Sequence, residues 1–279
     1  MAEILKGSNV ANFLTEDLIS RCRALTSPSD KSDTSPSQWE AGFTPTLAIF
    51  RIGENPSDIS YETGASKRCE KIGINIKKFI LPENSSNDEI LNTLTEIKND
   101  NSIHGCLMFR PLKDKALEKI ACEIIAEKDS DIPPCTAQAC IEILDFYGVE
   151  LEGKNAVVLG RSEIIGKPVA MLLLNRNATV TICHSKTKNL PEICKRSDII
   201  ISAMGKAKFI DSKFVSEGQV IIDVGINFDE NNKLCGDVNF DDVEKIVSKI
   251  TPVPGGVGAV TTSVLAKHVI EAAERRMNL

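Results

Sequence analysis

The chain has 279 residues, a formal net charge of −6 and 42% hydrophobic residues, which suits two domains or one large soluble α/β domain. The acidic balance argues against a nucleic-acid or membrane-surface binder. There is no apolar run near the roughly 20 residues of a membrane span, and the N-terminus lacks the apolar region of a secretory signal.

The nine cysteines are odd in number and include no C-x-x-C pair, and the three histidines are scattered. This pattern predicts neither a disulfide framework nor a metal site. Most of the thiols are expected to be small buried hydrophobes in a reducing compartment, so we expect a cytoplasmic protein.

The first half of the chain alternates apolar strands with helices. After a helix at 11–24 and a Ser/Pro/Asp-rich surface loop at 27–38, the patterns predict strands at 46–53, 74–81 and 104–109. Helices are predicted at 60–72, 85–100 and 115–129. Strands alternating with helices indicate a mainly parallel sheet.

A second strand–helix series begins near residue 135. The apolar runs predict strands at 155–160, 179–185, 198–205 and 219–226. Helices are predicted at 137–148, 166–175, 190–195 and 213–215, the last two of them short. The whole pattern therefore predicts an α/β fold.

The stretch NAVVLGRSEIIGKPVAMLLL predicts a strand, a glycine turn and a helix, with Gly160 ending the strand and Gly166 opening the helix. Free backbone N–H groups and the helix dipole favour a phosphate at such a junction. The spacing is not G-x-G-x-x-G, so an ordinary turn explains these residues equally well. Ser162 and Lys167 are either phosphate contacts or residues that only start the helix.

The strand after this helix ends in His184-Ser185-Lys186-Thr187, without the acidic residue that usually binds the ribose of NAD. Ser185, Lys186 and Arg161 could instead receive a 2′-phosphate, which a carboxylate would repel. We therefore expect NADP rather than NAD, although NAD is compatible. The alternative is a solvated basic loop without a ligand.

Several stretches together resemble the methylenetetrahydrofolate dehydrogenase/cyclohydrolase family. They are HGCLMFRPL (104–112), PPCTAQACIEIL (133–144), GRSEIIGKPVA (160–170), ATVTICHSKT (178–187), VIIDVGIN (220–227), GDVNF (236–240) and KITPVPGGVGAVT (249–261). The resemblance implies two α/β domains around a cleft and a homodimer. Residues 135–262 would form a Rossmann-like NAD(P)-binding domain, and 1–134 plus 263–279 a domain that binds a tetrahydrofolate derivative.

The resemblance also implies site residues. The substrate would contact Tyr61, Asp131, Pro254, Gly255 and Gly256, with Tyr61, the catalytic candidate, against the pterin and the Asp131 carboxylate on its amino-pyrimidine edge. The cofactor would contact Gly160, Arg161, Ser162, Ile165, Gly166, His184, Ser185, Lys186, Thr187, Ala203, Gly225 and Thr261. A core aromatic at Tyr61 and a purely structural turn at the two glycines of TPVPGG are the alternatives.

One departure from the family concerns the residue one helical turn after Tyr61. The family has there a lysine, taken as the acid/base group of the cyclohydrolase step; here that position is Ala65. Lys67, six residues after Tyr61, points away from that face. Phe109 replaces the glutamine that partners the family's lysine. We therefore expect a dehydrogenase with little or no cyclohydrolase activity.

Two further departures are the lack of a glycine-rich loop after Asp131 and the presence of Ala259 in place of a proline. Two other hypotheses stay open. One is the usual bifunctional enzyme with another group replacing the lysine, and the other is a nucleotide-binding protein without turnover. A dehydrogenase of shikimate-like acids would explain the nucleotide half but not TPVPGGVG.

Overall fold

The computed structural model describes residues 1–26, 43–126 and 132–277. By its internal contacts the chain divides into two compact units. Unit 1 comprises Met1–Asn12 and Pro133–Val264, and unit 2 comprises Phe13–Ile132 and Leu265–Leu279. The expected boundaries lie within two residues of the two later transitions, whereas the grouping of residues 1–12 with unit 1 was not anticipated.

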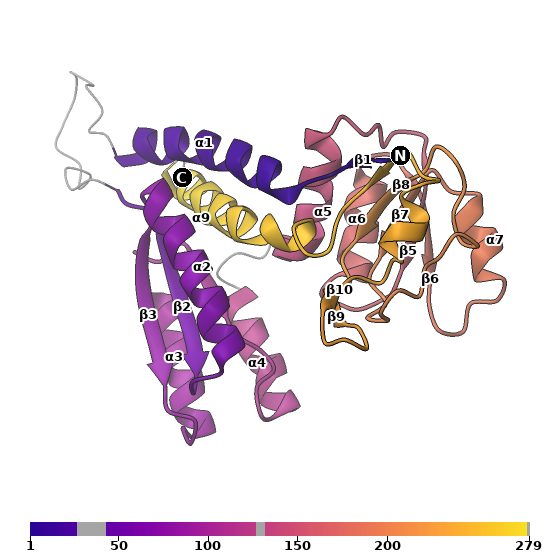
Figure 1. The fold of residues 1–279 in the computed structure, drawn as a ribbon. Helices are drawn as coiled ribbons and strands as arrows, with labels where there is room; N and C mark the ends of the chain where they lie inside the picture. The colour runs from indigo at the N-terminus through magenta and orange to yellow at the C-terminus, as the bar shows by residue number, and fades with distance from the viewer. Residues whose placement is uncertain (27–42, 127–131, 278–279) are drawn as a thin grey trace. The chain divides into compact units, whose positions relative to one another are not determined.

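Unit 1 is built on a parallel sheet (Figure 1). Its strands, among the described residues, run in the order β1 (Glu3–Ile4), β11 (Lys249–Ile250), β8 (Val220–Asp223), β7 (Ile199–Ser202), β5 (Asn155–Leu159) and β6 (Thr179–Cys183). Every neighbouring pair is parallel. The chain passes from β5 to β6 on one side and then to β7 on the other side of β5, so the strand order reverses between β5 and β7.

Four helices and a hairpin complete unit 1 in its described part. The helices are α5 (Cys135–Phe146), α6 (Gly166–Asn175), α7 (Leu190–Lys195) and α8 (Phe240–Val243), and the 3-10 turn Val257–Ala259 comes after them. The hairpin pairs β9 (Asn227–Phe228) with β10 (Leu234–Cys235) in antiparallel fashion. The predicted helix at 213–215 is wrong: Asp211 accepts from the Lys213 N–H (2.9 Å), which favours a turn instead.

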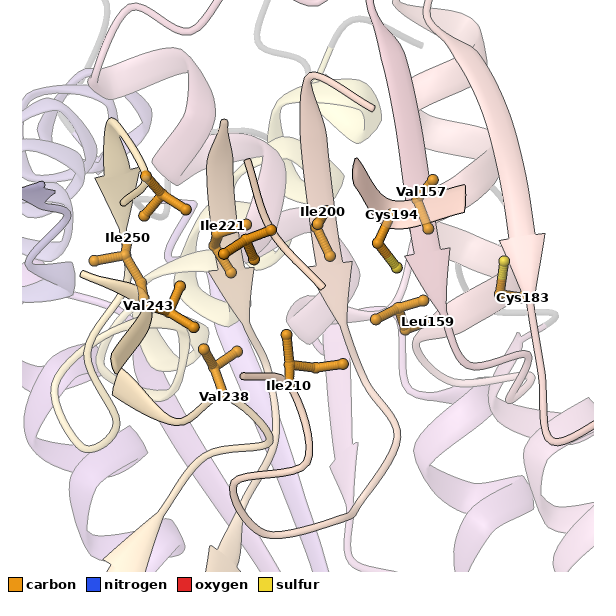
Figure 2. Close-up of a cluster of buried hydrophobic side chains, with 12 residues drawn as sticks. Val157, Leu159, Cys183, Cys194, Ile200, Ile210, Ile221, Val238, Val243 and Ile250 are labelled. Atoms are coloured by element: carbon orange, nitrogen blue, oxygen red, sulfur yellow. The ribbon is translucent and has the colours of Figure 1, made fainter. Parts of the chain in front are cut away.

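The core of unit 1 explains why its strands are continuously apolar. Figure 2 shows Val157, Ile200, Ile221 and Ile250, from four strands, on one face of the sheet. Cys194 of α7 and Val243 of α8 pack in the same cluster, and the other members are Leu159, Cys183, Ile210, Val215, Val238 and Val247. A parallel sheet covered on both faces needs apolar residues at successive positions.

Unit 2 contains a smaller parallel sheet. In its described part β2 (Thr46–Ile52) lies between β3 (Asn75–Leu81) and β4 (Gly105–Met108). The connecting helices are α2 (Pro56–Ile72), α3 (Asn87–Asn99) and α4 (Lys115–Ala126). Ile90, Leu94 and Ile97 of α3 are buried against Ala48 and Phe50 of β2, as the helical spacing predicted.

Two long helices contribute to both units, α1 (Gly7–Thr26) and α9 (Thr261–Met277). Within unit 2 they are joined by Arg21, which donates from Nη2 and Nε to the Glu274 carboxylate at 2.6 and 2.9 Å. Arg276 donates to the carbonyl oxygens of Asn101 and Ile103. The end of α9 therefore belongs to unit 2. No helix in the described ranges is long and apolar enough to cross a membrane.

We expect Ser86→Ala to destabilise unit 2 by about 1 kcal/mol, because Ser86 and Glu89 form a reciprocal capping box at the start of α3. Ser85→Ala is the control, since its hydroxyl is outside this box. Urea unfolding of both variants checks the prediction, and an equal loss in the two would contradict it.

Candidate functional site

The turn between β5 and α6 is too tight for side chains at its two glycines. Gly160 has φ +127°, and a Cβ there would overlap the carbonyl oxygen of Ala203, the residue after β7. A Cβ at Gly166 would overlap the carbonyl of Gly160. The turn thus forms a narrow backbone cradle at the reversal of the strand order, where open α/β sheets bind their ligands. The start of a helix at such a turn is a candidate site for a dinucleotide phosphate.

The residues between these two glycines are mostly exposed, and one of them, Ser162, binds backbone N–H groups at the start of α6. Arg161 and Ser162 are exposed. The N–H groups of Ile165 and Gly166 donate to the Ser162 hydroxyl at 3.2 and 3.3 Å, so Ser162 caps the start of α6. Lys167 pairs with Glu163 at 2.5 Å. Ser162 thus contacts the backbone where α6 begins and Lys167 contacts the Glu163 side chain, while their contact with a phosphate stays a prediction.

After β6 the chain forms a hydrogen-bonded turn at residues 184–187, in which Lys186 is exposed. The His184 N–H donates to the Thr187 hydroxyl at 2.9 Å, and the Lys186 N–H to His184 Nδ1 at 3.2 Å. Ser185 and Lys186 are exposed. The Gly160 N–H donates to the Cys183 carbonyl at 2.9 Å, which joins this turn to the glycine turn. The predicted phosphate-binding residues Arg161, Ser185 and Lys186 therefore come from two adjoining strand ends.

Ala203 and Gly225 come after β7 and β8 at the same edge of the sheet. The Ala203 N–H donates to the Leu159 carbonyl at 2.8 Å, which fixes it beside the glycine turn. Gly225 is buried, but the next residue, Ile226, is 72% exposed. An apolar side chain presented at this edge is a candidate ligand contact. No pattern in the sequence marked Ile226, because 219–226 reads as one apolar strand.

The TPVPGG segment divides into an exposed and a packed part. Pro254 and Gly255 are exposed, and Gly255 has φ +99°. Gly256 is buried, and a Cβ there would overlap the Pro252 carbonyl. Packing alone therefore explains why position 256 is a glycine, while Pro254 and Gly255 are exposed and could contact a ligand. Thr261, also predicted as a contact, is buried at the start of α9, where its hydroxyl donates to the Gly258 carbonyl.

In unit 2, Tyr61 lies on α2 and meets Phe109 edge-on, with ring centroids 6.1 Å apart. Ala65 is fully buried one turn further along the helix, and Lys67 is exposed. Asp131 lies outside the described residues. Phe109 also lines a cavity of about 480 Å³ at the carboxyl ends of the strands, together with Gly53, Glu54, Asp58 and Lys113. The sequence analysis did not predict Glu54 or Asp58 as lining residues.

Buried charges hold the helix that carries Tyr61. Arg51 Nε of β2 donates to Glu62 Oε2 at 2.8 Å, and Lys78 Nζ of β3 lies 2.8 Å from Glu62 Oε1. Arg51 also donates to the Gly53 carbonyl. Although burial acts in the opposite direction, the bonds from Lys78 and Arg51 hold the pKa of Glu62 below its usual value. The residue next to Tyr61 is therefore fixed to two strands.

These features define a dinucleotide-binding α/β domain joined to a second α/β unit. The chain belongs to the tetrahydrofolate dehydrogenase/cyclohydrolase family. The family's catalytic domain matches residues 5–131, and its NAD(P)-binding domain matches residues 134–277.

Individual relatives match along nearly the whole chain. The bifunctional protein FolD of Carboxydothermus hydrogenoformans is 47% identical over 98% of both chains. The crystal structure of the bifunctional FolD dehydrogenase/cyclohydrolase of Campylobacter jejuni superimposes with a TM-score of 0.89 at 34% identity, covering 99% of this chain and 100% of that one. The Trypanosoma brucei dehydrogenase-cyclohydrolase, complexed with NADP cofactor and an inhibitor, gives 0.87 at 30% identity, covering 100% and 99%.

We expect Gly160→Ala to weaken NADPH binding about tenfold or more, because the added Cβ displaces the Ala203 carbonyl. Gly153→Ala is the matched control. Gly153 also has a positive φ (+73°), but a Cβ added there would contact no other atom. A fluorescence titration with NADPH checks the difference. Equal affinities in the two variants would contradict the role of the cradle.

We expect Glu62→Gln to destabilise unit 2 by about 3–5 kcal/mol, since it leaves the buried Arg51 charge without its partner. Lys78→Met should cost less than about 1 kcal/mol, because the Lys78 side chain is 47% exposed. Chemical unfolding of both variants measures the two losses. Similar values would show that the buried pair is not the contact that fixes α2.

Proposed function

We propose that this chain oxidises 5,10-methylenetetrahydrofolate to 5,10-methenyltetrahydrofolate, with NADP as the hydride acceptor. The family assignment and the NADP bound to the Trypanosoma brucei relative support this proposal. The observation that carries it is the backbone cradle at Gly160 and Gly166, beside a strand end that presents Lys186 and no carboxylate.

The residues of the chain would mainly align the reactants. NADP, when bound, supplies the carbon that accepts the hydride. The hydride leaves the carbon between two nitrogens, whose lone pairs stabilise the resulting amidinium cation, so no side-chain proton transfer is needed. Arg161, Ser185 and Lys186 would receive the 2′-phosphate. Tyr61, held on α2 next to Phe109, would contact the pterin.

The relatives favour a bifunctional chain over a dehydrogenase alone. The Carboxydothermus hydrogenoformans relative, 47% identical to this chain, is named bifunctional, and the two structural relatives are named for both the dehydrogenase and the cyclohydrolase. We therefore propose that the methenyl product is also hydrolysed here. Because the family's lysine position is Ala65, another group would have to activate the water.

A dehydrogenase without cyclohydrolase activity is the second candidate. It is favoured by Ala65, which is fully buried and has no group for acid/base chemistry, and by Phe109 in contact with Tyr61. Loss of a positioned acid/base group typically lowers a rate by roughly two to four orders of magnitude. A cytoplasmic location, which rests on the cysteine pattern, and a homodimer, which rests on the family resemblance, are further proposals.

One assay tests both candidates. With methylenetetrahydrofolate, we expect NADPH to form faster with NADP than NADH forms with NAD. A bifunctional chain would keep the methenyl absorbance low, whereas the second candidate would accumulate it. Hydrolysis of added methenyltetrahydrofolate without dinucleotide, compared with heat-denatured protein, isolates the second step. Lack of any dinucleotide reduction by the folded chain would refute the proposed activity.

A further inference from the structure

A fully buried carboxylate, Asp237, gathers the chain segments that come after β7 and β8. Its Oδ2 accepts from the Met204 N–H at 2.6 Å, the Gly205 N–H at 3.3 Å and the Ser202 hydroxyl at 3.2 Å. Its Oδ1 accepts from the Lys206 N–H at 2.8 Å and from Asn227 Nδ2 at 2.9 Å. One side chain thus binds three successive N–H groups of the loop after β7 as well as the β9 segment.

A second buried carboxylate fixes the main chain around Asp237. Asp223 Oδ1, at the end of β8, accepts from the Gly225 and Asp237 N–H groups at 2.9 and 3.1 Å, and Oδ2 accepts from the Val238 N–H at 2.9 Å. A Cβ at Gly225 would overlap the Asp237 carboxylate, and one at Gly236 would overlap that of Asp223. The two glycines are therefore required for the carboxylates to come this close to the backbone.

The loop that Asp237 holds is a wall of the dinucleotide cradle. Ala203 directly precedes the three bound N–H groups, and its carbonyl oxygen occupies the space where Gly160 would otherwise carry a Cβ. Its N–H is bonded to Leu159 at 2.8 Å. Any movement of residues 204–206 would therefore be transmitted to the gap between the ends of β5 and β7.

We infer that Asp237 is a positioning residue for the dinucleotide: it holds residues 203–206 at the spacing from Gly160 that the cofactor needs. This inference rests on the proposed use of NADP. A carboxylate suits the position because it is an acceptor at both oxygens. Asparagine has nearly the same shape, but its NH₂ group would face N–H donors. The variant would therefore lose hydrogen bonds to residues 204–206 without a change in side-chain size.

Asp237→Asn tests the inference, with Asp242→Asn as the matched control. Asp242 is an aspartate of the same unit that accepts a backbone bond, from the Ser212 N–H at 2.7 Å, away from the cradle. In Asp237→Asn we expect the Kd for NADPH and the KM for NADP to rise about tenfold or more, with the KM for methylenetetrahydrofolate unchanged. Asp242→Asn should leave all three unchanged.

A milder variant covers the case in which Asp237→Asn does not fold. Asn227→Ala removes one donor to Asp237 and should raise the same two constants by a smaller factor, at a nearly unchanged melting temperature. A lowered melting temperature with unaltered NADPH affinity in these variants would overturn the inference alone. If the unaltered chain bound no NADPH, the proposed function and the inference would both fall.

Discussion

The main-chain contact between Gly160 and Ala203 is the constraint on which the candidate cofactor site depends. These residues come directly after β5 and β7, neighbouring parallel strands between which the chain reverses its order. At a reversal the connections leave in opposite directions, and a gap opens at the carboxyl ends of the strands. Here the backbones at the two strand ends come so close that a Cβ at Gly160 would meet the Ala203 carbonyl. A phosphate bound there would meet the start of α6, where the Ser162 hydroxyl already accepts from the Ile165 and Gly166 N–H groups.

Unit 2 keeps its candidate site in place by a different physical means. The sheet is small, and β2 carries Arg51 within an otherwise apolar run. A charge in this position is tolerated only because Glu62 and the Gly53 carbonyl accept from it. Glu62, in the first half of α2 next to Tyr61, is connected to β2 by Arg51 and to β3 by Lys78. The position of Tyr61 thus depends on a buried ion pair. Such a pair adds little net stability, but removing one partner destabilises the fold because the other charge stays buried and unpaired.

Features that depend on local pattern could be predicted from the sequence, whereas features that depend on tertiary contact could not. Runs rich in apolar and β-branched residues located β2 to β8, and Gly160 and Gly166 marked the turn that the structure brings beside Ala203. The two-residue strands β1 and β11 carry too few residues for any periodicity. The helix expected at 213–215 is lost to an Asx turn at Asp211. Asp223 and Asp237 looked like ordinary polar residues, because their partners are backbone groups brought together only by folding.

The same distinction bears on the two reactions proposed for the chain. Hydride transfer depends on where two ligands are held, and that is determined by backbone spacing, buried carboxylates and helix anchoring rather than by one reactive side chain. Hydrolysis of the methenyl cation depends on a proton-transferring group at a defined point. Replacement of a single residue can therefore remove the second activity while the first survives, and Ala65 stands where such a replacement would act. If hydrolysis is retained, as the 47% identity to a relative named bifunctional favours, the alanine at position 65 requires that the water-activating group come from elsewhere in the chain.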